Sequence, residues 1–245
     1  MPESIGMGLF ETVSGRVNPP GPLLFVQETG STAYNLAVAG SDVDYLGVYV
    51  APTRTILGLG EPPGTLTNPE GTKPDCTVHE VGKFCRLLLK GNPTIVESLF
   101  VERNFGARGL WGALRAHRRA FLTRTAVEQY LGYCQGQLLR IEKGRSLARG
   151  DGGRPDVKWA YHMLRLALDV ERIVRGEEPV VWRTGDEREQ LMGVRRGETP
   201  LAAVVADVKW RIAAVNAKKP WPLPDEGDRA FLNDWLLFVR ETAGR

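Results

Sequence analysis

The chain has 245 residues, of which 42% are hydrophobic and 25% charged, and its formal net charge is +3. These values fit a globular protein of one large domain, or of a small α/β domain joined to a helical one, and they permit a polyphosphate or nucleic-acid partner without requiring one. Three cysteines without a CxxC spacing, three histidines, no signal-peptide pattern and no run of about 18 apolar residues argue against a structural zinc site and a membrane span, and favour a cytoplasmic location.

The first third of the chain has the pattern of strands separated by turns. Residues 23–26 are a short apolar run that follows a loop rich in proline, and they predict a buried strand. Residues 43–50 are β-branched and aromatic and predict a second strand, and residues 76–79 predict a third. Between these two, residues 52–74 are rich in Gly, Pro and Thr, so we expect a loop with at most one short turn of helix.

The remainder of the chain is predicted to be helical. The helix candidates are residues 81–90, 93–100, 110–122, 126–143, 156–174, 201–217 and 228–241. A basic, glycine-rich loop at 144–155 separates two of them. The expected class is therefore α+β, with the sheet first and an all-α region second.

Two aspartates, Asp42 and Asp44, stand at the start of the second expected strand. Because side chains alternate along a strand, both point to the same face. Carboxylates this close repel each other unless a cation lies between them, and Mg²⁺ binds such hard oxygen ligands together with substrate phosphates. Two ions about 3.5–4 Å apart can stabilise the attacking and the leaving oxygen of a phosphoryl displacement. Taken alone, the motif also fits a solvated turn.

A second motif, Gly30-Ser31, follows the first expected strand and opens a short helical stretch with Ser31 as its N-cap. Backbone N–H groups at such a turn can bind a phosphate, and Gly30 lets the ligand approach closely. The alternative is an ordinary capped turn. The succession of strand, Gly-Ser, short helix, loop, Asp-x-Asp and strand favours the phosphate and metal site.

This succession resembles the hG[GS]…[DE]h[DE] motif of the DNA polymerase β superfamily. The string GSTAYNLAVAGSDVDYLGVYV resembles the branch of nucleotidyltransferases that includes the RNA-repair-associated RlaP group. One position departs from that branch, because Asn35 stands where a glycine is frequent. The other matching features span residues 26–198 and comprise Asp75, Lys83-Phe84, Asn92-Pro93 with Glu97, and Lys158, His162 and Arg165.

The resemblance implies a small mixed-sheet domain of the polymerase β palm type at 1–105, and a helical domain at 106–245 that closes the nucleotide cleft. It implies attack of a hydroxyl on the α-phosphate of a nucleoside triphosphate, with an RNA end, a small molecule or a protein as the acceptor. Asp42 and Asp44 would bind Mg²⁺ or Mn²⁺. The nucleotide would lie against Gly30, Ser31, Tyr34 and Ser41.

A third carboxylate is needed to complete such a metal site and to help deprotonate the acceptor. We expect Asp75, because it leads the third strand. Glu80 is the second candidate, although it would face the other side of a regular strand and could instead begin the next helix, where an acidic residue is favoured. His79 is four residues after Asp75, so the two side chains would point to the same face of a strand. His79 is either near the site or an ordinary strand histidine.

The helix expected at 156–174 carries a polar stripe within apolar surroundings. Lys158, His162, Arg165, Asp169 and Arg172 fall on that stripe. Buried cations must be paired or face a ligand, so we expect Lys158, His162 and Arg165 to line the nucleotide cleft. The alternative is internal pairing of Asp169 with Arg165 or Arg172. Glu97 similarly fits a buried capping or salt-bridge residue.

Three further questions stay open. A basic cluster at 115–124 either contacts a nucleic-acid backbone or forms a solvated face; its members are Arg115, His117, Arg118, Arg119 and Arg124. Four tryptophans are expected to be packing residues rather than platforms for bases, namely Trp182, Trp210, Trp221 and Trp235. The alternative to an enzyme is a module that binds a nucleotide or RNA without turnover, but two repelling carboxylates favour the enzyme.

Overall fold

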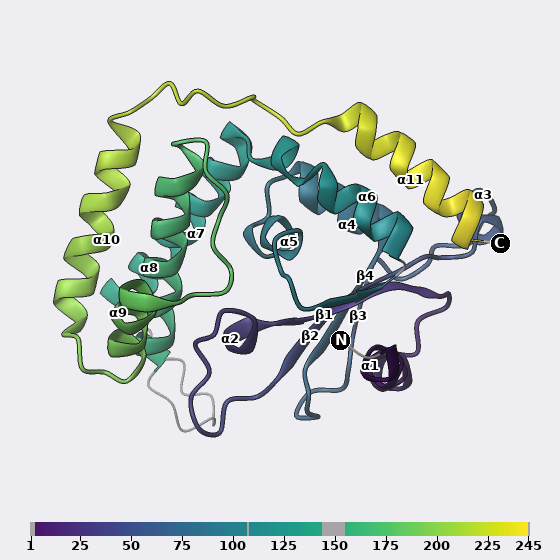
Figure 1. Ribbon diagram of the computed structural model, residues 1–245, viewed down its shortest axis with the longest axis horizontal. Helices are drawn as coiled ribbons and strands as arrows, with labels where there is room; N and C mark the ends of the chain where they lie inside the picture. The colour runs from purple at the N-terminus through teal and green to yellow at the C-terminus, as the bar shows by residue number, and fades with distance from the viewer. Residues whose placement is uncertain (1–2, 107, 144–154, 245) are drawn as a thin grey trace.

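The computed structural model describes residues 3–106, 108–143 and 155–244. Its sheet has the order β3-β4-β2-β1-β5 among these residues (Figure 1). The strands are β1 (Leu23–Thr29), β2 (Asp44–Tyr49), β3 (Thr65–Thr67), β4 (Cys76–Glu80) and β5 (Asn104–Gly106). β2 and β4 are parallel and the other neighbours are antiparallel, so the sheet is mixed.

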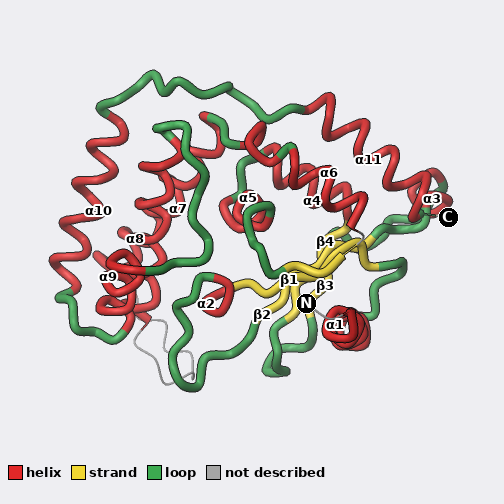
Figure 2. The backbone as a smooth tube through the Cα atoms, in the orientation of Figure 1, coloured by secondary structure: helices red, strands yellow, loops and turns green. Residues whose placement is uncertain are grey.

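Helices make up most of the rest of the described chain (Figure 2). In the first half they are α1 (Glu3–Val17), α2 (Gly30–Ala33), α3 (Thr53–Leu57), α4 (Val81–Leu89), α5 (Pro93–Ser98), α6 (Arg108–Ala116) and the 3₁₀ helix η1 (Arg118–Phe121). In the second half they are α7 (Arg124–Glu142), α8 (Pro155–Ile173), α9 (Gly185–Arg195), α10 (Leu201–Asn216) and α11 (Arg229–Ala243). The expected α+β class, with a helical region after the sheet, is confirmed.

The sheet is covered on both faces. α1 packs on one face, against a small core that includes Val26 of β1, while α4, α6 and α11 lie above the other face (Figure 1). Phe25, the preceding residue of β1, stacks on Trp111 of α6 with ring centroids 3.6 Å apart. Because neighbouring side chains of a strand point to opposite faces, β1 contributes to both layers, and its first four residues, Leu23 to Val26, are all apolar.

The helices α7 to α10 form a lobe beside the sheet, and α8 lies inside it in contact with α7, α9 and α10. This position explains why apolar side chains surround the polar stripe of α8, since Met163, Leu164 and Leu166 are buried against these neighbours. The described part of the chain holds no helix long and apolar enough to span a bilayer.

The structure adds elements that the sequence pattern did not predict. They are α1, α9 and the three-residue strands β3 and β5. The helix expected at 110–122 is divided into α6 and η1, and the loop expected at 144–155 lies almost entirely outside the described residues. The domain boundary expected after residue 105 falls within β5, and α11 contacts α4 and α6 beside the sheet.

Candidate functional site

Gly30 and Asp44 touch where β1 ends and β2 begins. Thr29 pairs with Asp44 in the β1–β2 register, and Gly30 follows with a φ of +66°. A Cβ at Gly30 would lie 2.4 Å from Oδ2 of Asp44, so both backbone conformation and space require glycine here. The N-cap of α2 is Thr29 rather than Ser31, so the expected Ser31 cap is wrong; Ser31 is the second residue of the helix.

The structure places Asp42 and Asp75 within electrostatic range of Asp44. Asp42 lies just before β2, Asp44 begins β2, and Asp75 lies just before β4, where its carbonyl accepts a hydrogen bond from the Tyr45 N–H at 2.8 Å. Burial raises the pKa of Asp44, and the negative charges of Asp75 and Asp42 raise it further, whereas Lys158 and Lys73 oppose the increase. The charged form of Asp44 is therefore unfavourable in this position, and a bound cation would stabilise it.

The fit of these residues to a metal ion is partial. Among the described residues, no group of three or more His, Cys, Asp or Glu side chains is gathered closely enough to hold one. Nζ of Lys73 lies 2.6 Å from Oδ2 of Asp42 and makes an ion pair with it. Mg²⁺ commonly uses only one or two carboxylates and completes its shell with phosphates and waters, so Asp42 and Asp44 suit it chemically. Metal binding by Asp42, Asp44 and Asp75 stays a prediction.

Glu80 and His79 lie outside this group of carboxylates. The Glu80 carboxylate caps α4 by accepting a hydrogen bond from the Gly82 N–H at 2.7 Å, and it pairs with Arg240 at 2.9 Å. The alternative that Glu80 begins a helix is thus confirmed. Nδ1 of His79 is 2.9 Å from Oγ1 of Thr65, and burial and the charge of Lys83 lower the His79 pKa.

α8 places Lys158 within electrostatic range of Asp44, and His162 follows one turn later. Lys158 is exposed at the beginning of α8 and acts electrostatically on Asp44. His162, one turn later, stacks on Tyr161 with ring centroids 4.4 Å apart. Burial lowers the His162 pKa to about 3, and the charges of Arg165, Lys158 and Arg195 contribute. His162 is therefore a neutral imidazole at physiological pH.

Arg195, the last residue of α9, is a site residue that the sequence did not reveal. Its Nη2 donates to Oγ of Ser41 at 2.9 Å, and its Nη1 donates to the Tyr161 hydroxyl at 3.3 Å. The Ser41 hydroxyl also accepts the Val38 N–H at 2.9 Å. Arg195 thereby ties the loop that carries Asp42 to α8. Only recognition of α9 as a helix ending beside this loop would have indicated it.

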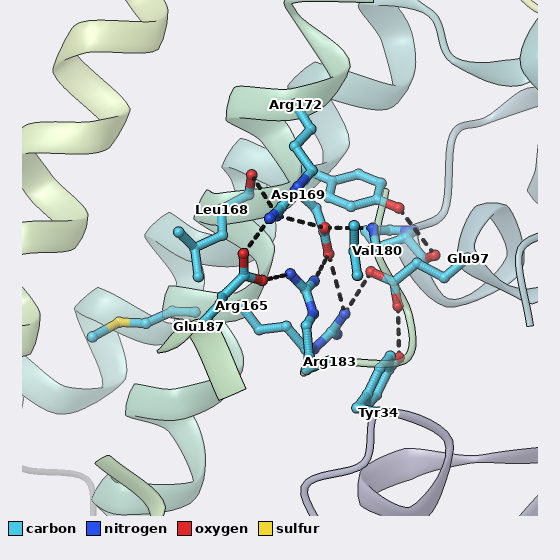
Figure 3. A network of polar contacts seen from close by, with 12 residues as sticks. Tyr34, Glu97, Arg165, Leu168, Asp169, Arg172, Val180, Arg183 and Glu187 are labelled. Atoms are coloured by element: carbon cyan, nitrogen blue, oxygen red, sulfur yellow. Dashed lines mark hydrogen bonds and ion pairs between the residues drawn. The ribbon is translucent and has the colours of Figure 1, made fainter. Parts of the chain in front are cut away.

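Tyr34 and Arg165 lie in a buried polar network instead of an open cleft (Figure 3). The Tyr34 hydroxyl donates to Glu97 at 2.6 Å, Nη1 of Arg165 pairs with Glu97 at 2.7 Å, and the Arg165 guanidinium lies 3.8 Å from the centre of the Tyr34 ring. This placement contradicts the expected nucleotide contact of Arg165, because a cation in apolar surroundings needs a carboxylate partner and Glu97 supplies it.

The same network continues along α8 to α9. Asp169 lies 3.7 Å from Arg165 and 3.6 Å from Arg172, which confirms the alternative of internal pairing. Arg183, which is fully buried, donates to Asp169 and to Glu187, and Glu187 also accepts from Arg172 (Figure 3). The network therefore joins α5, α8, α9 and the residue that ends α2.

Comparison with known families agrees with this geometry. The model of the RNA repair pathway DNA polymerase beta family, RlaP, matches residues 10–236. The chain belongs to the RlaP family. The motifs had indicated this family, and the match includes Gly30, the three aspartates, Lys158 and Arg195. No curated protein and no solved structure matches the chain.

Asn35, which departs from the glycine frequent in the RlaP branch, has a φ of +57°. This left-handed conformation suits glycine, and asparagine is among the side chains that tolerate it. Nδ2 of Asn35 donates to the Arg183 carbonyl at 2.9 Å, and the Asn35 carbonyl accepts from Nε of Arg188 at 2.9 Å. The asparagine therefore keeps the backbone shape and fastens the turn after α2 to the segment that enters α9.

The structure also places the basic cluster and the tryptophans that the sequence had singled out. The basic cluster is bonded to the protein itself: Arg118 and Arg119 contact Glu178, and Arg124 contacts Asp225. Trp221 and Trp235 are buried packing residues as expected, whereas Trp182 and Trp210 are 42% and 66% exposed.

Proposed function

We propose that this member of the RlaP family is a metal-dependent nucleotidyltransferase that transfers a nucleoside monophosphate from a triphosphate to the hydroxyl of an RNA end. One observation carries the proposal: the β1–β2 register holds Asp44 against the Gly30 backbone and beside Asp42 and Asp75. Outside a cation site, such a grouping of carboxylates only costs electrostatic free energy.

In this proposal Asp42 and Asp44 share one task and Asp75 has another. Asp42 and Asp44 would hold Mg²⁺ or Mn²⁺, and the ion would polarise the α-phosphate and the attacking oxygen. Binding would require Asp42 to exchange its contact with Lys73 for the metal. Asp75 would accept the proton of the acceptor hydroxyl, since it is exposed and acts electrostatically on Asp44.

The phosphates of the nucleotide would lie between α2 and the cations of the helical lobe. Backbone N–H groups of Gly30 and Ser31 would donate to them, and Lys158 and Arg195 would neutralise their charge. His162, being neutral, would donate or accept one hydrogen bond rather than add charge. Ser41 would act indirectly, by orienting the Arg195 guanidinium.

The test is incubation with Mg²⁺ or Mn²⁺, each of the four triphosphates in turn and RNA with defined ends, followed by assay of pyrophosphate and of labelled RNA. We expect pyrophosphate release that requires the metal and is lost in Asp42→Asn and Asp44→Asn. Labelling of a small molecule or of the protein itself, with none of RNA, would move the acceptor to another hydroxyl.

A non-catalytic nucleotide- or RNA-binding module is the second candidate. The ion pair between Lys73 and Asp42 favours it, because that pair occupies a carboxylate that the metal would need. The module would bind a triphosphate and release no pyrophosphate with either metal. Its affinity would be unchanged by Asp42→Asn, whereas metal-assisted binding would be weakened.

A further inference from the structure

A hollow of about 130 Å³ lies between the end of β1, the last residue of α2 and the segments 101–103 and 181–182. We call it the Trp182 hollow. Its lining residues are Glu28, Ala33, Val101, Glu102, Arg103, Val181 and Trp182. None of the three aspartates or the nearby cations lines it, so it is separate from the site described above, although α2 borders both.

The hollow offers an aromatic surface that is firmly held. Trp182 is 42% exposed, while Val181 before it and Arg183 after it are buried. The Arg183 N–H donates to the Tyr34 carbonyl at 3.2 Å, and its side chain belongs to the buried network. The Trp182 ring thus projects from a fixed backbone. The Arg103 guanidinium lies over this ring in a cation–π contact, 5.8 Å from its centre, and both groups line the hollow.

The hollow also contains an unsatisfied acceptor. Oε2 of Glu28 is buried and has no hydrogen-bond partner among the residues that the structure describes. Nη1 of Arg103 is 3.6 Å away, which is an ion-pair distance but too long for a hydrogen bond. A buried acceptor without a donor is unfavourable. The Glu28 side chain as a whole is 20% exposed and lines the hollow, so a rotation of its carboxylate would let a ligand N–H supply the missing donor.

We propose that the Trp182 hollow binds a nucleobase, which stacks on Trp182 and donates an N–H to Glu28. Flat aromatic and guanidinium surfaces are the means by which proteins hold unpaired bases, and a base edge supplies the missing donor. The volume suits one ring system, since pockets that enclose larger ligands measure about 300–1,000 Å³. The choice of nucleic acid rests on the proposed function, and the base comes from either the RNA acceptor or the triphosphate.

The experiment measures binding without turnover. A fluorescently labelled single-stranded RNA and a triphosphate with a methylene group between its α- and β-phosphates, which cannot be transferred, are titrated separately into the full chain. The variants are Trp182→Ala and Trp182→Phe, of which the second keeps an aromatic ring. Trp210→Ala is the matched control, because Trp210 is the more exposed residue and lies on α10.

We expect Trp182→Ala to weaken binding of one ligand roughly tenfold, within the range for loss of one base–aromatic stack. Trp182→Phe should stay within about threefold of the wild type, and Trp210→Ala should match it. A loss confined to RNA assigns the base to the acceptor, and a loss confined to the analogue assigns it to the incoming nucleotide. Wild-type affinity of Trp182→Ala for both ligands, or no binding by the wild type, overturns the proposal.

The pyrophosphate assay separates this outcome from failure of the proposed function. If the wild type releases no pyrophosphate but Trp182→Ala still weakens binding, the base site stands and the transfer does not. If the wild type turns over and Trp182→Ala binds normally, the transfer stands and the base site does not.

Discussion

Asp44 carries its charge in a half-buried position beside two other carboxylates, and this position sets the pH dependence of its contribution to stability. Its pKa is raised by burial and by the charges of Asp75 and Asp42, so the folded state holds the proton more tightly than the unfolded state does. Stability without metal is therefore highest below the pKa of the unfolded chain. It falls as the pH rises through the raised pKa of the folded protein.

Asp44→Asn should remove the loss of stability that the wild type shows as the pH rises. In a chelator at pH 7 we expect the variant to melt at or above the wild-type temperature, and at about pH 3.5 the two should nearly coincide, because Asp44 is then mostly protonated in both states. Nucleotide transfer should fall at least about 100-fold. Thermal melts across this pH range and the pyrophosphate assay measure both effects.

Asp228 is the control residue, because an Asp→Asn substitution there should change the melting temperature at pH 7 in the opposite direction. The Phe231 N–H and His117 lower the pKa of Asp228, so Asp228→Asn should lower the melting temperature at pH 7. If Asp44→Asn melts well below the wild type at pH 7, or keeps near wild-type turnover, the proposed role of Asp44 fails.

Asp75 and Glu80 should separate chemistry from stability. Asp75 is exposed, so Asp75→Asn should lose transfer, still bind triphosphate and fold normally. Glu80 is buried and pairs with the partly buried Arg240, so Glu80→Gln should leave this guanidinium without its counter-charge and destabilise the protein by about 3 kcal/mol. Turnover of the folded Glu80→Gln fraction should remain near wild type. Urea unfolding and transfer assays, run in parallel, would show the opposite pattern if Glu80 were the third carboxylate.

At the scale of elements, α8 combines two kinds of cation within one helical stripe. Lys158 is exposed and near Asp44, while Arg165 is buried and paired with Glu97. Lys158→Ala should therefore weaken triphosphate binding about tenfold, or about 1.4 kcal/mol, with little effect on folding. Arg165→Ala should instead leave the buried Glu97 carboxylate without its ion-pair partner and destabilise the protein by about 3–5 kcal/mol.

Arg195→Ala extends this comparison to α9. Since Arg195 is bonded to Ser41 and Tyr161 and acts on His162, we expect a loss of triphosphate affinity similar to that of Lys158→Ala. Arg196→Ala is the matched control, because Arg196 contacts Glu189 and Glu198 at the surface. Equal effects of the two substitutions on nucleotide affinity would contradict the assignment.

The sequence was informative where one element determines its own geometry. The Gly30-Ser31 turn and the short spacing of the two aspartates indicated the candidate site, although strand alternation applies only to Asp44 because Asp42 lies in the loop before β2. The apolar surroundings of α8 indicated that its polar stripe was paired or bound to a ligand. The partner itself could not be predicted, because Glu97 is 68 residues from Arg165 in the chain. α9 was missed because its buried residues, Leu191 to Val194, are consecutive and follow a charged stretch without helical periodicity.

At the scale of the molecule, the sheet and the helical lobe share one apolar core. A single cluster of buried side chains runs from Phe25 and Phe84 at the sheet to Met163 and Val208 in the lobe. The chain also returns on itself, because the Thr53 N–H donates to the Gly244 carbonyl at 2.8 Å. These connections could not be predicted from local patterns, since they join segments that are far apart in the sequence.

This arrangement predicts that residues 1–105 do not fold alone. The fragment lacks part of β5, and it lacks the Trp111 ring that stacks on Phe25 and the Trp235 side chain that is buried on α11. Losing a large aromatic partner costs about 3–5 kcal/mol, which is comparable with the whole stability of a domain this small. We expect the isolated fragment to show no cooperative thermal transition by circular dichroism.

The full chain is the comparison for the fragment. Because one core and the buried network of Glu97, Arg165, Asp169 and Arg183 join the two parts, urea should unfold them in one transition. All six tryptophans lie after residue 105, but Trp111 stacks on Phe25 of β1, so its fluorescence reports on the packing of the sheet. Far-ultraviolet circular dichroism reports mainly on the helices, and the midpoints of the two signals should coincide. Two separated midpoints, or a fragment that melts cooperatively, would instead establish residues 1–105 as an independent domain.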